Sequence, residues 1–532
     1  MGVVIDNQAY PLNPSSNCPL FYTGSAPQAT GGYQYAKLDS KNTITEKEPF
    51  IRPMVSTKSL NDFYNRSNTV TILPKLTQVL SDLDILAIND TKPFKSGDIP
   101  TLCFTIDEAN LNKVHNAEKS KTVSSDLTYI SSNEVKEFKD VDFELSGSSP
   151  LTRYAPKASY KIELPKNNTF NDYRKFKLRS LYSDPSYLRE YVSAEILNST
   201  GLPAPDFTFS RVFINGNSYG LFGFMVDYRK PWLLKNFAYD SDDYTNGPLY
   251  SGDNNATLAY IGTNQSAYNT STNGDKIFPN NYYSLKEEQA SKQSAPSYRR
   301  LIGLTKFLAS PAEEISLTNN TIAAWERRIY PESFLRAAAL EILLGNTNGY
   351  VTAGENYMLY GASLESYMTF IASSMESTFG NTVEDMTKML TGNYTDYPGV
   401  SNDFRPLLQE MLKVPEYNSR FQELLSELSN KVVNPSVLST HIDVVANMIR
   451  DDVTWDQAIA RNYVDIGNKT YNAQLAFNTS NPTDAMNDYI NRSVNGVDFD
   501  KAVNGSTGHS SLSGVKEWVT NQHNAISGNK TS

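Results

Sequence analysis

The sequence predicts an α+β fold in which β-rich parts precede a helical half. Short apolar runs such as VVIDNQAYPL alternate with Pro, Gly and Asn turns near the N-terminus, a pattern typical of strands. From residue 298 onward, apolar residues recur at helical spacing, as in SFLRAAALEILLG. A hydrophobic content of 39%, with 33 Tyr and 24 Phe in 532 residues, supports sizeable packed cores in more than one domain.

Composition and pattern divide the chain into consecutive segments. They are a β-rich N-terminal module with a sandwich-like pattern (1–55), a mixed connecting segment (56–140), a β-rich lobe (141–237), a polar surface insertion (238–297), a helical lobe (298–475) and a polar C-terminal segment (476–532). In the connecting segment, residues 61–86 predict a short helix and residues 99–106 a strand. In the last segment, residues 511–519 predict one more short helix.

The chain has only two cysteines, Cys18 and Cys103, and two interpretations of them stay open. In an oxidising compartment they form one disulfide that closes a long loop, worth roughly 3–5 kcal/mol. Otherwise both are buried free thiols.

The β-rich lobe contains two predicted strands that flank a turn rich in Gly and Ser, at 142–164, and the second strand alternates around Lys161. This order is found in the nucleotide-binding lobe of kinases, where backbone amides approach the phosphates and a Lys pairs with them. A plain β-hairpin explains the same pattern. Further on, Asp184 is placed to cap a helix, and Asn215-Gly216 marks a tight turn between strands.

The central stretch of the chain is residues 334–380. It predicts a buried helix, a polar loop, a strand at 357–360, a turn, a strand at 367–371 and a second polar loop. Each strand brings a loop of Asn, Ser and Glu to one place. The two loops therefore form the floor of a candidate active site.

The order and spacing of these motifs resemble those of the CotH family, the atypical kinase-like proteins of spore coats and fungal cell surfaces. The similarity covers roughly residues 141–461, and it includes FKLR at 176–179, the D-x-S-x-x-R run at 184–189 and the two polar loops. It implies an atypical protein-kinase-like two-lobed fold preceded by a small β-sandwich-like module. It also implies ATP and Mg²⁺ as cofactors if the site is functional.

The two loops depart from the pattern of that family. Its first loop carries an Asp followed by an Asn, and its second carries D-x-D. Here the catalytic Asp is replaced by Asn348, and the pair is Ser374 and Glu376, while Asn356 is kept. Because Asn348 cannot accept a proton and Ser374 is a neutral ligand, Asn356 and Glu376 remain as the stronger metal ligands, with Ser374 as a weak one.

The resemblance also implies nucleotide-binding residues. Lys157 or Lys161 would contact the phosphates, and Glu190 or Glu195 would pair with Lys161. Both glutamates are more simply explained as polar-face residues of a helix.

Two functional hypotheses follow. The first is a surface protein with a degenerate kinase-like scaffold, a pseudokinase, that acts as an adhesin or invasin on a host-cell receptor or a cell-wall component. The second is an active secretory-pathway kinase that transfers phosphate from ATP to Ser or Thr of coat or secreted proteins. A purely structural coat component is a third, weaker possibility.

The net charge of -10 excludes nucleic acid as the main partner, and the four histidines stand at no metal-ligand spacing.

Sequons of the form N-x-S/T favour a secreted, glycosylated protein of the cell surface, cell wall or spore coat. They occur at Asn65, Asn89, Asn167, Asn198, Asn255, Asn264, Asn269, Asn319, Asn393, Asn468, Asn478, Asn491, Asn504 and Asn529. No apolar run reaches the length of a membrane span, and no signal peptide follows Met1. Fungal relatives generally start with a signal peptide and often end in a lipid-anchor signal. We therefore expect that both ends have been trimmed, including a C-terminal lipid anchor, or that the gene model starts internally.

Overall fold

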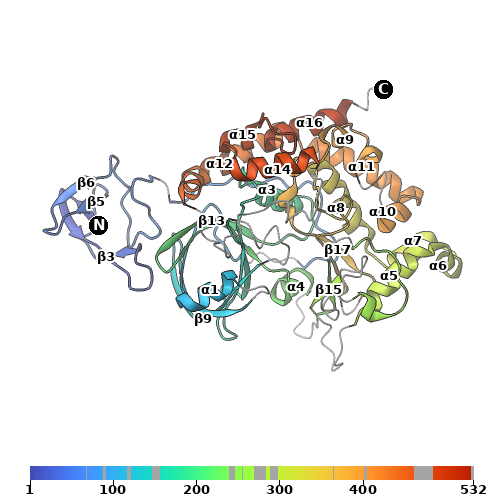
Figure 1. The fold of residues 1–532 in the computed structure, drawn as a ribbon, viewed down its shortest axis with the longest axis horizontal. Coiled ribbons are helices and arrows are strands. Elements are labelled where there is room, and N and C mark those ends of the chain that lie inside the picture. Colours follow the sequence, from blue (N-terminus) through green and yellow to red (C-terminus); the bar gives the residue numbers. More distant parts are fainter. Residues whose placement is uncertain are drawn as a thin grey trace.

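The computed structural model describes residues 1–67, 69–87, 92–116, 121–146, 156–238, 246–253, 256–268, 283–287, 297–362, 365–398, 400, 404–460 and 483–528. It contains an N-terminal sheet, a closed β-barrel, a second four-stranded sheet and a helical half (Figure 1). The predicted α+β class is confirmed. None of the helices in this described part combines the length and apolarity needed to cross a membrane.

The N-terminal module consists of a four-stranded sheet and a separate two-stranded ribbon, where the sequence predicted a sandwich-like unit. The sheet has the order β2-β1-β5-β6, with β1 (Gly2–Ile5), β2 (Gln8–Pro11), β5 (Gln34–Leu38) and β6 (Ile44–Lys47), and the ribbon pairs β3 (Asn13–Pro14) with β4 (Tyr22–Thr23). Asp6 and Asn7 form the β1–β2 turn with φ of 49° and 64°. Asp and Asn tolerate this left-handed conformation, which matches the twist of a hairpin.

The barrel closes in the order β10-β11-β13-β12-β7-β8-β9, and only the β12–β7 pair is parallel. Its strands are β7 (Thr101–Thr105), β8 (Val123–Ile130), β9 (Val135–Leu145), β10 (Tyr160–Glu163), β11 (Lys175–Arg179), β12 (Phe207–Ile214) and β13 (Asn217–Val226). Helix α1 (Glu108–Asn116) packs on β8 and β9. Buried aromatic residues fill the core, among them Phe104, Phe143, Tyr160 and Phe222. The predicted turn at Asn215-Gly216 joins β12 to β13.

The connecting segment differs from its prediction. The strand expected at 99–106 is β7, but the helix expected at 61–86 is wrong, because the described residues there run without a helix. Pro74 interrupts the stretch, and its backbone bonds elsewhere: Val79 N donates to Ser199 O at 2.7 Å and Leu83 N to Gly201 O at 3.2 Å. Tertiary contacts thus override the local pattern.

The second sheet has the order β15-β14-β16-β17, with all pairs antiparallel. Its strands are β14 (Leu249–Gly252), β15 (Tyr283–Glu287), β16 (Tyr357–Tyr360) and β17 (Thr369–Ala372). The strands predicted at 357–360 and 367–371 are therefore present, the second beginning two residues later. The polar insertion contributes β14 and β15, so it takes part in the sheet that supports the two polar loops.

The helical half is built around α8 (Pro331–Leu344), which is buried from Ser333 to Leu344. Around it lie α5 (Arg299–Ala309), α6 (Pro311–Thr318), α7 (Thr321–Glu326), α9 (Met386–Met389), α10 (Pro406–Met411), α11 (Pro415–Lys431) and α12 (Pro435–Ala458), while α3 (Arg189–Ser199) and α4 (Lys230–Phe237) come from the preceding lobe (Figure 1). Several of these helices begin with Pro, whose fixed φ suits the first turn and whose missing N–H is not needed there.

The C-terminal segment is folded more fully than its polar composition predicted. It forms α14 (Asp484–Asn495), α15 (Phe499–Asn504) and α16 (Val515–Gly528), the last starting four residues after the helix predicted at 511–519. Trp518 is fully buried, and its Nε1 donates to Leu343 O at 3.0 Å. Gly345, which ends α8 with φ of 63°, leaves room for this ring, because a Cβ there would lie 2.2 Å from it.

The last turns of α12 join the helical half to the barrel. Arg211 of β12 forms a two-point ion pair with Asp452, with nitrogen–oxygen distances of 2.6 and 2.8 Å. Trp455 packs on Phe213 at 5.4 Å between ring centroids. Buried ion pairs of this kind need both partners, because a lone buried charge is strongly destabilising.

Cys18 and Cys103 form a disulfide, so the free-thiol interpretation is wrong. The bridge ties the N-terminal module to β7 across 85 residues of sequence.

We expect reduction to lower the free energy of unfolding by about 4–5 kcal/mol, because an open loop of this length regains much chain entropy when unfolded. Chemical unfolding with and without a reductant measures the change. A Cys18→Ser/Cys103→Ser variant should not respond to the reductant, and an equal response of both proteins would contradict the prediction.

Candidate functional site

The two polar loops predicted as the floor of a site lie side by side. The first joins α8 to β16, and the second follows β17 and contains the short helix η3 (Met375–Ser377). Thr347 N donates to Ser377 O at 3.2 Å, and Ser373 Oγ donates to Asn356 O at 2.8 Å. Because β16 and β17 are paired antiparallel, the start of one strand and the end of the other meet at one edge.

Asn348, Asn356 and Ser374 are brought to this edge. Asn356 Nδ2 donates to Asn348 O at 2.9 Å, so the side-chain amide closes the first loop on itself. Asn356 and Ser374 both have left-handed backbones, with φ of 54° and 55°. Asn tolerates this conformation and Ser does so less readily, which is typical of loops held by their surroundings.

Glu376 is also at this edge, but it is tied to the barrel. Its carboxylate forms an ion pair with Arg179, the last residue of β11. The Arg179 Nε also donates to Glu190 at 3.0 Å, so one guanidinium joins two carboxylates from different parts of the chain. Burial raises the pKa of Glu190, and Arg179 opposes this shift.

Lys161 lines a cavity of about 200 Å³ on the outer face of β10 and β11. Its Nζ lies 3.6 Å from Glu144, and Asp227 and Arg229 close the opposite side. Lys161 does not contact Glu190 in any described ion pair, since the partner of Glu190 is Arg179. The cavity is the candidate nucleotide pocket.

Lys157 and Glu195 lie away from this cavity. Lys157 is 2% exposed and pairs with Asp456 of α12 at 2.7 Å, so it serves the joint between barrel and helices. Glu195 lies five residues after Glu190 on α3, which turns it about 140° around the helix axis. It faces Lys92 and Asp206, and burial raises its pKa. The structure therefore does not bring these two predicted residues to Lys161.

A row of charged residues beside the cavity escaped the sequence analysis. Lys177 pairs with Asp227 at 3.1 Å, and Asp227 also pairs with Arg229 at 3.1 Å. Although burial alone would raise the pKa of Asp227, these two cations hold it below its usual value. The signal was present in KFKLR at 175–179, because Lys175, Lys177 and Arg179 alternate along one strand and so share one face.

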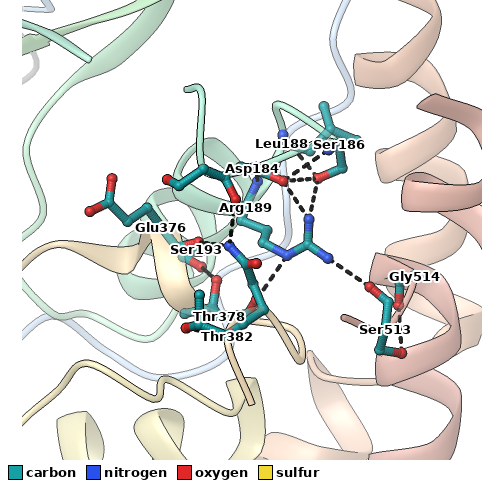
Figure 2. Close-up of polar contacts among 12 residues, drawn as sticks. Asp184, Ser186, Leu188, Arg189, Ser193, Glu376, Thr378, Thr382, Ser513 and Gly514 are labelled. Carbon is teal, nitrogen blue, oxygen red and sulfur yellow. Dashed lines mark hydrogen bonds and ion pairs between the residues drawn. The ribbon is translucent and has the colours of Figure 1, made fainter. Parts of the chain in front are cut away.

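Arg189 holds the second loop in place (Figure 2). Its guanidinium is fully buried, pairs with Asp184, and donates to Thr378 O at 2.9 Å and to Ser513 O at 2.7 Å. In Figure 2 the Glu376 carboxylate points away from this group. The predicted helix cap at Asp184 is wrong, because α3 starts at Arg189 and Leu188 is its N-cap residue. Asp184 instead accepts the N–H of Arg189 at 2.8 Å.

Glu341 of α8 lies beneath the first loop and is 7% exposed. Its carboxylate accepts the N–H of Thr352 at 2.9 Å and packs against Gly349, where a Cβ would lie 2.5 Å from Glu341 Cδ. Burial raises the pKa of Glu341 to about 7, although backbone amides of the loop oppose the shift. The spacing of apolar residues in the sequence predicted a buried helix here, but it did not single out Glu341 as a site residue.

The comparisons with known proteins show the family of the chain. The family model described as CotH kinase protein matches residues 143–521, more than half of the chain. The chain belongs to the CotH family. The predicted family membership is thereby confirmed, and the match extends beyond the expected residues 141–461 into the C-terminal helices.

Curated relatives with this similarity come from a fungus and a bacterium. Invasin CotH2 of Rhizopus delemar is 26% identical over 471 residues, which is 86% of this chain and 73% of the relative. Invasin CotH3 of the same organism is 25% identical over 469 residues, with 86% and 74% covered. Inner spore coat protein H of Bacillus subtilis is 20% identical over 317 residues, with 60% and 78% covered.

The protonation of Glu341 makes the free energy of unfolding depend on pH, which can be tested. The unfolded carboxyl has a pKa near 4.5 and the folded one about 7, so the folded state binds the proton more tightly. The contribution of protonated Glu341 to the free energy of unfolding is complete below pH 4.5 and is lost as the pH rises through 7, a change of roughly 3 kcal/mol. We expect Glu341→Gln to remove this slope from unfolding free energies measured between pH 4.5 and 8.

Glu332, at the start of the same helix, provides the control. Arg420 and Arg336 hold its pKa below the usual value although burial opposes them, so its contribution is present at neutral pH and falls in acid. Glu332→Gln should therefore change the pH profile in the opposite sense. Parallel profiles for wild type and Glu341→Gln would show that Glu341 does not titrate in this range.

Proposed function

We propose that this protein acts at the cell surface or in a spore coat as a kinase-like scaffold with a degenerate phosphotransfer centre, used for adhesion. The observation that carries the proposal is the ion pair of Glu376 with Arg179. Glu376 is the one carboxylate left at the loop positions that the family pattern assigns to catalysis and metal binding, and it is already held by Arg179, which it shares with Glu190.

The other loop positions support the same conclusion. A phosphotransfer centre needs a carboxylate that accepts the proton of the attacking hydroxyl, and Asn348 has none. General-base help of this kind contributes about 10²–10⁴-fold to a rate. No three His, Cys, Asp or Glu side chains among the described residues gather in a way that could hold a metal ion. Asn356 and Ser374 are neutral and Glu376 is occupied by its ion pair with Arg179, so these three residues do not fit the charged oxygen ligands that Mg²⁺ prefers.

A kinase-like two-lobed arrangement accounts for the barrel, the α8-centred half and the Arg179–Glu190 ion pair. On this proposal the barrel and the α8-centred half are the two lobes, and the candidate pocket lies on the outer face of β10 and β11. Arg179 and Glu190 repeat the pairing of a strand cation with a helix carboxylate that positions phosphates in kinases. This pair favours a second candidate function, an active secretory-pathway kinase that uses ATP and Mg²⁺ and modifies Ser or Thr.

The names of the relatives suggest the partner. Two of them are called invasins and one a spore coat protein. A protein of this kind meets a host-cell surface receptor or a cell-wall component.

Restoring the missing carboxylates tests the degenerate centre. We expect ATP with Mg²⁺ to leave the thermal unfolding of the wild type unchanged and to stabilise the Asn348→Asp/Ser374→Asp variant. At 100 times its dissociation constant, a ligand stabilises the folded state by about 2.7 kcal/mol, which differential scanning calorimetry detects. Ser419→Asp/Asn430→Asp, on the exposed face of α11, adds the same charge elsewhere and should behave as the wild type.

The two candidate functions give different results in this experiment. Stabilisation of the wild type by ATP and Mg²⁺ would contradict the degenerate centre and favour the kinase. Stabilisation of the restored variant alone would support the proposal. If neither protein responds, the two loops do not form a magnesium site even with the carboxylates restored, and the kinase is excluded.

Adhesion is tested with beads that carry the purified chain. We expect them to stay on cultured animal cells or on isolated fungal cell walls through washing. The Asn348→Asp/Ser374→Asp variant should bind equally well, because the proposal separates adhesion from the phosphotransfer centre. Beads with heat-unfolded chain are the control. Failure of native beads to bind either surface better than this control would overturn the adhesive function.

A further inference from the structure

The N-x-S/T sequons of the sequence can be sorted by where the fold places them. Eight of their asparagines fall within the described residues, and all but one are exposed. The exception is Asn198, which is partly buried on α3.

Five of the exposed asparagines lie in turns, outside regular helices and strands. They are Asn65, Asn167, Asn264, Asn319 and Asn393. Asn65 and Asn319 have φ of 64° and 51°, a left-handed backbone that Asn adopts at turns and helix ends. A turn holds the side chain clear of helical neighbours and leaves room for a bulky group.

The sequon at Asn393 also has a suitable local geometry. Thr395 Oγ1 donates to Asn393 Oδ1 at 2.9 Å, and Thr395 N donates to the same oxygen at 3.1 Å. Asn264 forms a similar Asx turn, since its Oδ1 accepts the N–H of Ser266 at 3.1 Å. In these turns the carboxamide and the hydroxyl residue of the sequon lie together on the surface.

The sequon at Asn198 is the opposite case. Its hydroxyl residue, Thr200, is fully buried and donates to Ile196 O at 3.0 Å. Ser199 between them is also buried and bonds to the same carbonyl. The adjoining Gly201 packs so closely that a Cβ there would lie 2.1 Å from Ser81 O. A glycan at Asn198 would have to share this packed surface.

We propose that Asn65, Asn167, Asn264, Asn319 and Asn393 carry N-linked glycans and that Asn198 does not. In the reaction the Asn Nδ2 attacks the anomeric carbon of an oligosaccharide carried on a lipid pyrophosphate. The new C–N bond replaces the C–O bond to the pyrophosphate, which leaves with the electron pair, and the amide loses one proton. The lipid-linked donor and its transferase belong to the secretory pathway, so the inference rests on passage through that pathway and not on adhesion.

The glycans would be distributed unevenly over the protein. Asn167 lies between β10 and β11 of the barrel, and Asn319 and Asn393 lie in the helical half. Residues 1–64 contain no sequon. The N-terminal sheet would thus stay free of N-glycans while the barrel and the helical half carry them.

The test is site-by-site mass spectrometry of the chain made with a signal peptide in a eukaryotic secretory host. Secreted and cell-associated material are both treated with peptide N-glycosidase F in ¹⁸O-labelled water, which converts each glycosylated Asn to a labelled Asp. We expect label at the five turn sites and none at Asn198. The proposal would be overturned if Asn198 carried as much ¹⁸O label as the five turn sites, or if the five turn sites carried none.

Variants at one sequon make the result independent of overall folding. Thr395→Ala should abolish the label at Asn393, because the sequon loses its hydroxyl, while Thr395→Ser should keep it. The other four sites serve as internal controls in both variants. Because the readout is a covalent modification, it is unaffected by whether the chain adheres to cells, so the two proposals can fail separately.

Discussion

The buried guanidinium of Arg189 is the interaction on which the candidate site depends. It is fully buried, and its hydrogen bonds reach Asp184, the carbonyl of Thr378 in the second loop and the carbonyl of Ser513 before α16. Removing one partner of such a buried charge costs about 3–5 kcal/mol, because the other is left unpaired. Chain segments more than 300 residues apart are thus held in one arrangement by a single side chain. The position of the loop that carries Glu376 follows from it.

The neighbouring residue on α3 extends this arrangement to the barrel. Glu190 follows Arg189, and consecutive helical residues point in directions about 100° apart. Arg189 therefore reaches the second loop while Glu190 reaches Arg179 at the end of β11. The first turn of α3 positions both sides of the site. The ion pairs of α12 with Arg211 and Lys157 add a second connection between the same two parts.

The sequence predicted the elements well and the partners of charged residues poorly. Periodicity located α8, β16 and β17, and with them the meeting of the two polar loops, because β16 and β17 follow each other in the chain and pair. The sequence predicts Lys157 and Glu195 at the nucleotide. In the structure Lys157 pairs with Asp456, which lies 299 positions away on α12. Such a choice depends on tertiary packing, which local spacing does not contain. The same limit explains residues 61–86, where backbone bonds to Ser199 and Gly201 replace a local helix.

The substituted loop residues suit a fold that is stabilised without a metal ion. Glu190 and Glu376 already share one cation, Arg179, and burial raises the pKa of Glu190. Further carboxylates at 348 and 374 would add negative charge to the same loops, and in the absence of Mg²⁺ that repulsion destabilises the folded state. Neutral Asn and Ser avoid this repulsion. Active sites commonly give up stability for function, and a site released from catalysis is free to recover it. On the proposed function, the network around Arg189 is retained because it holds the scaffold together, whereas the carboxylates served only the chemistry.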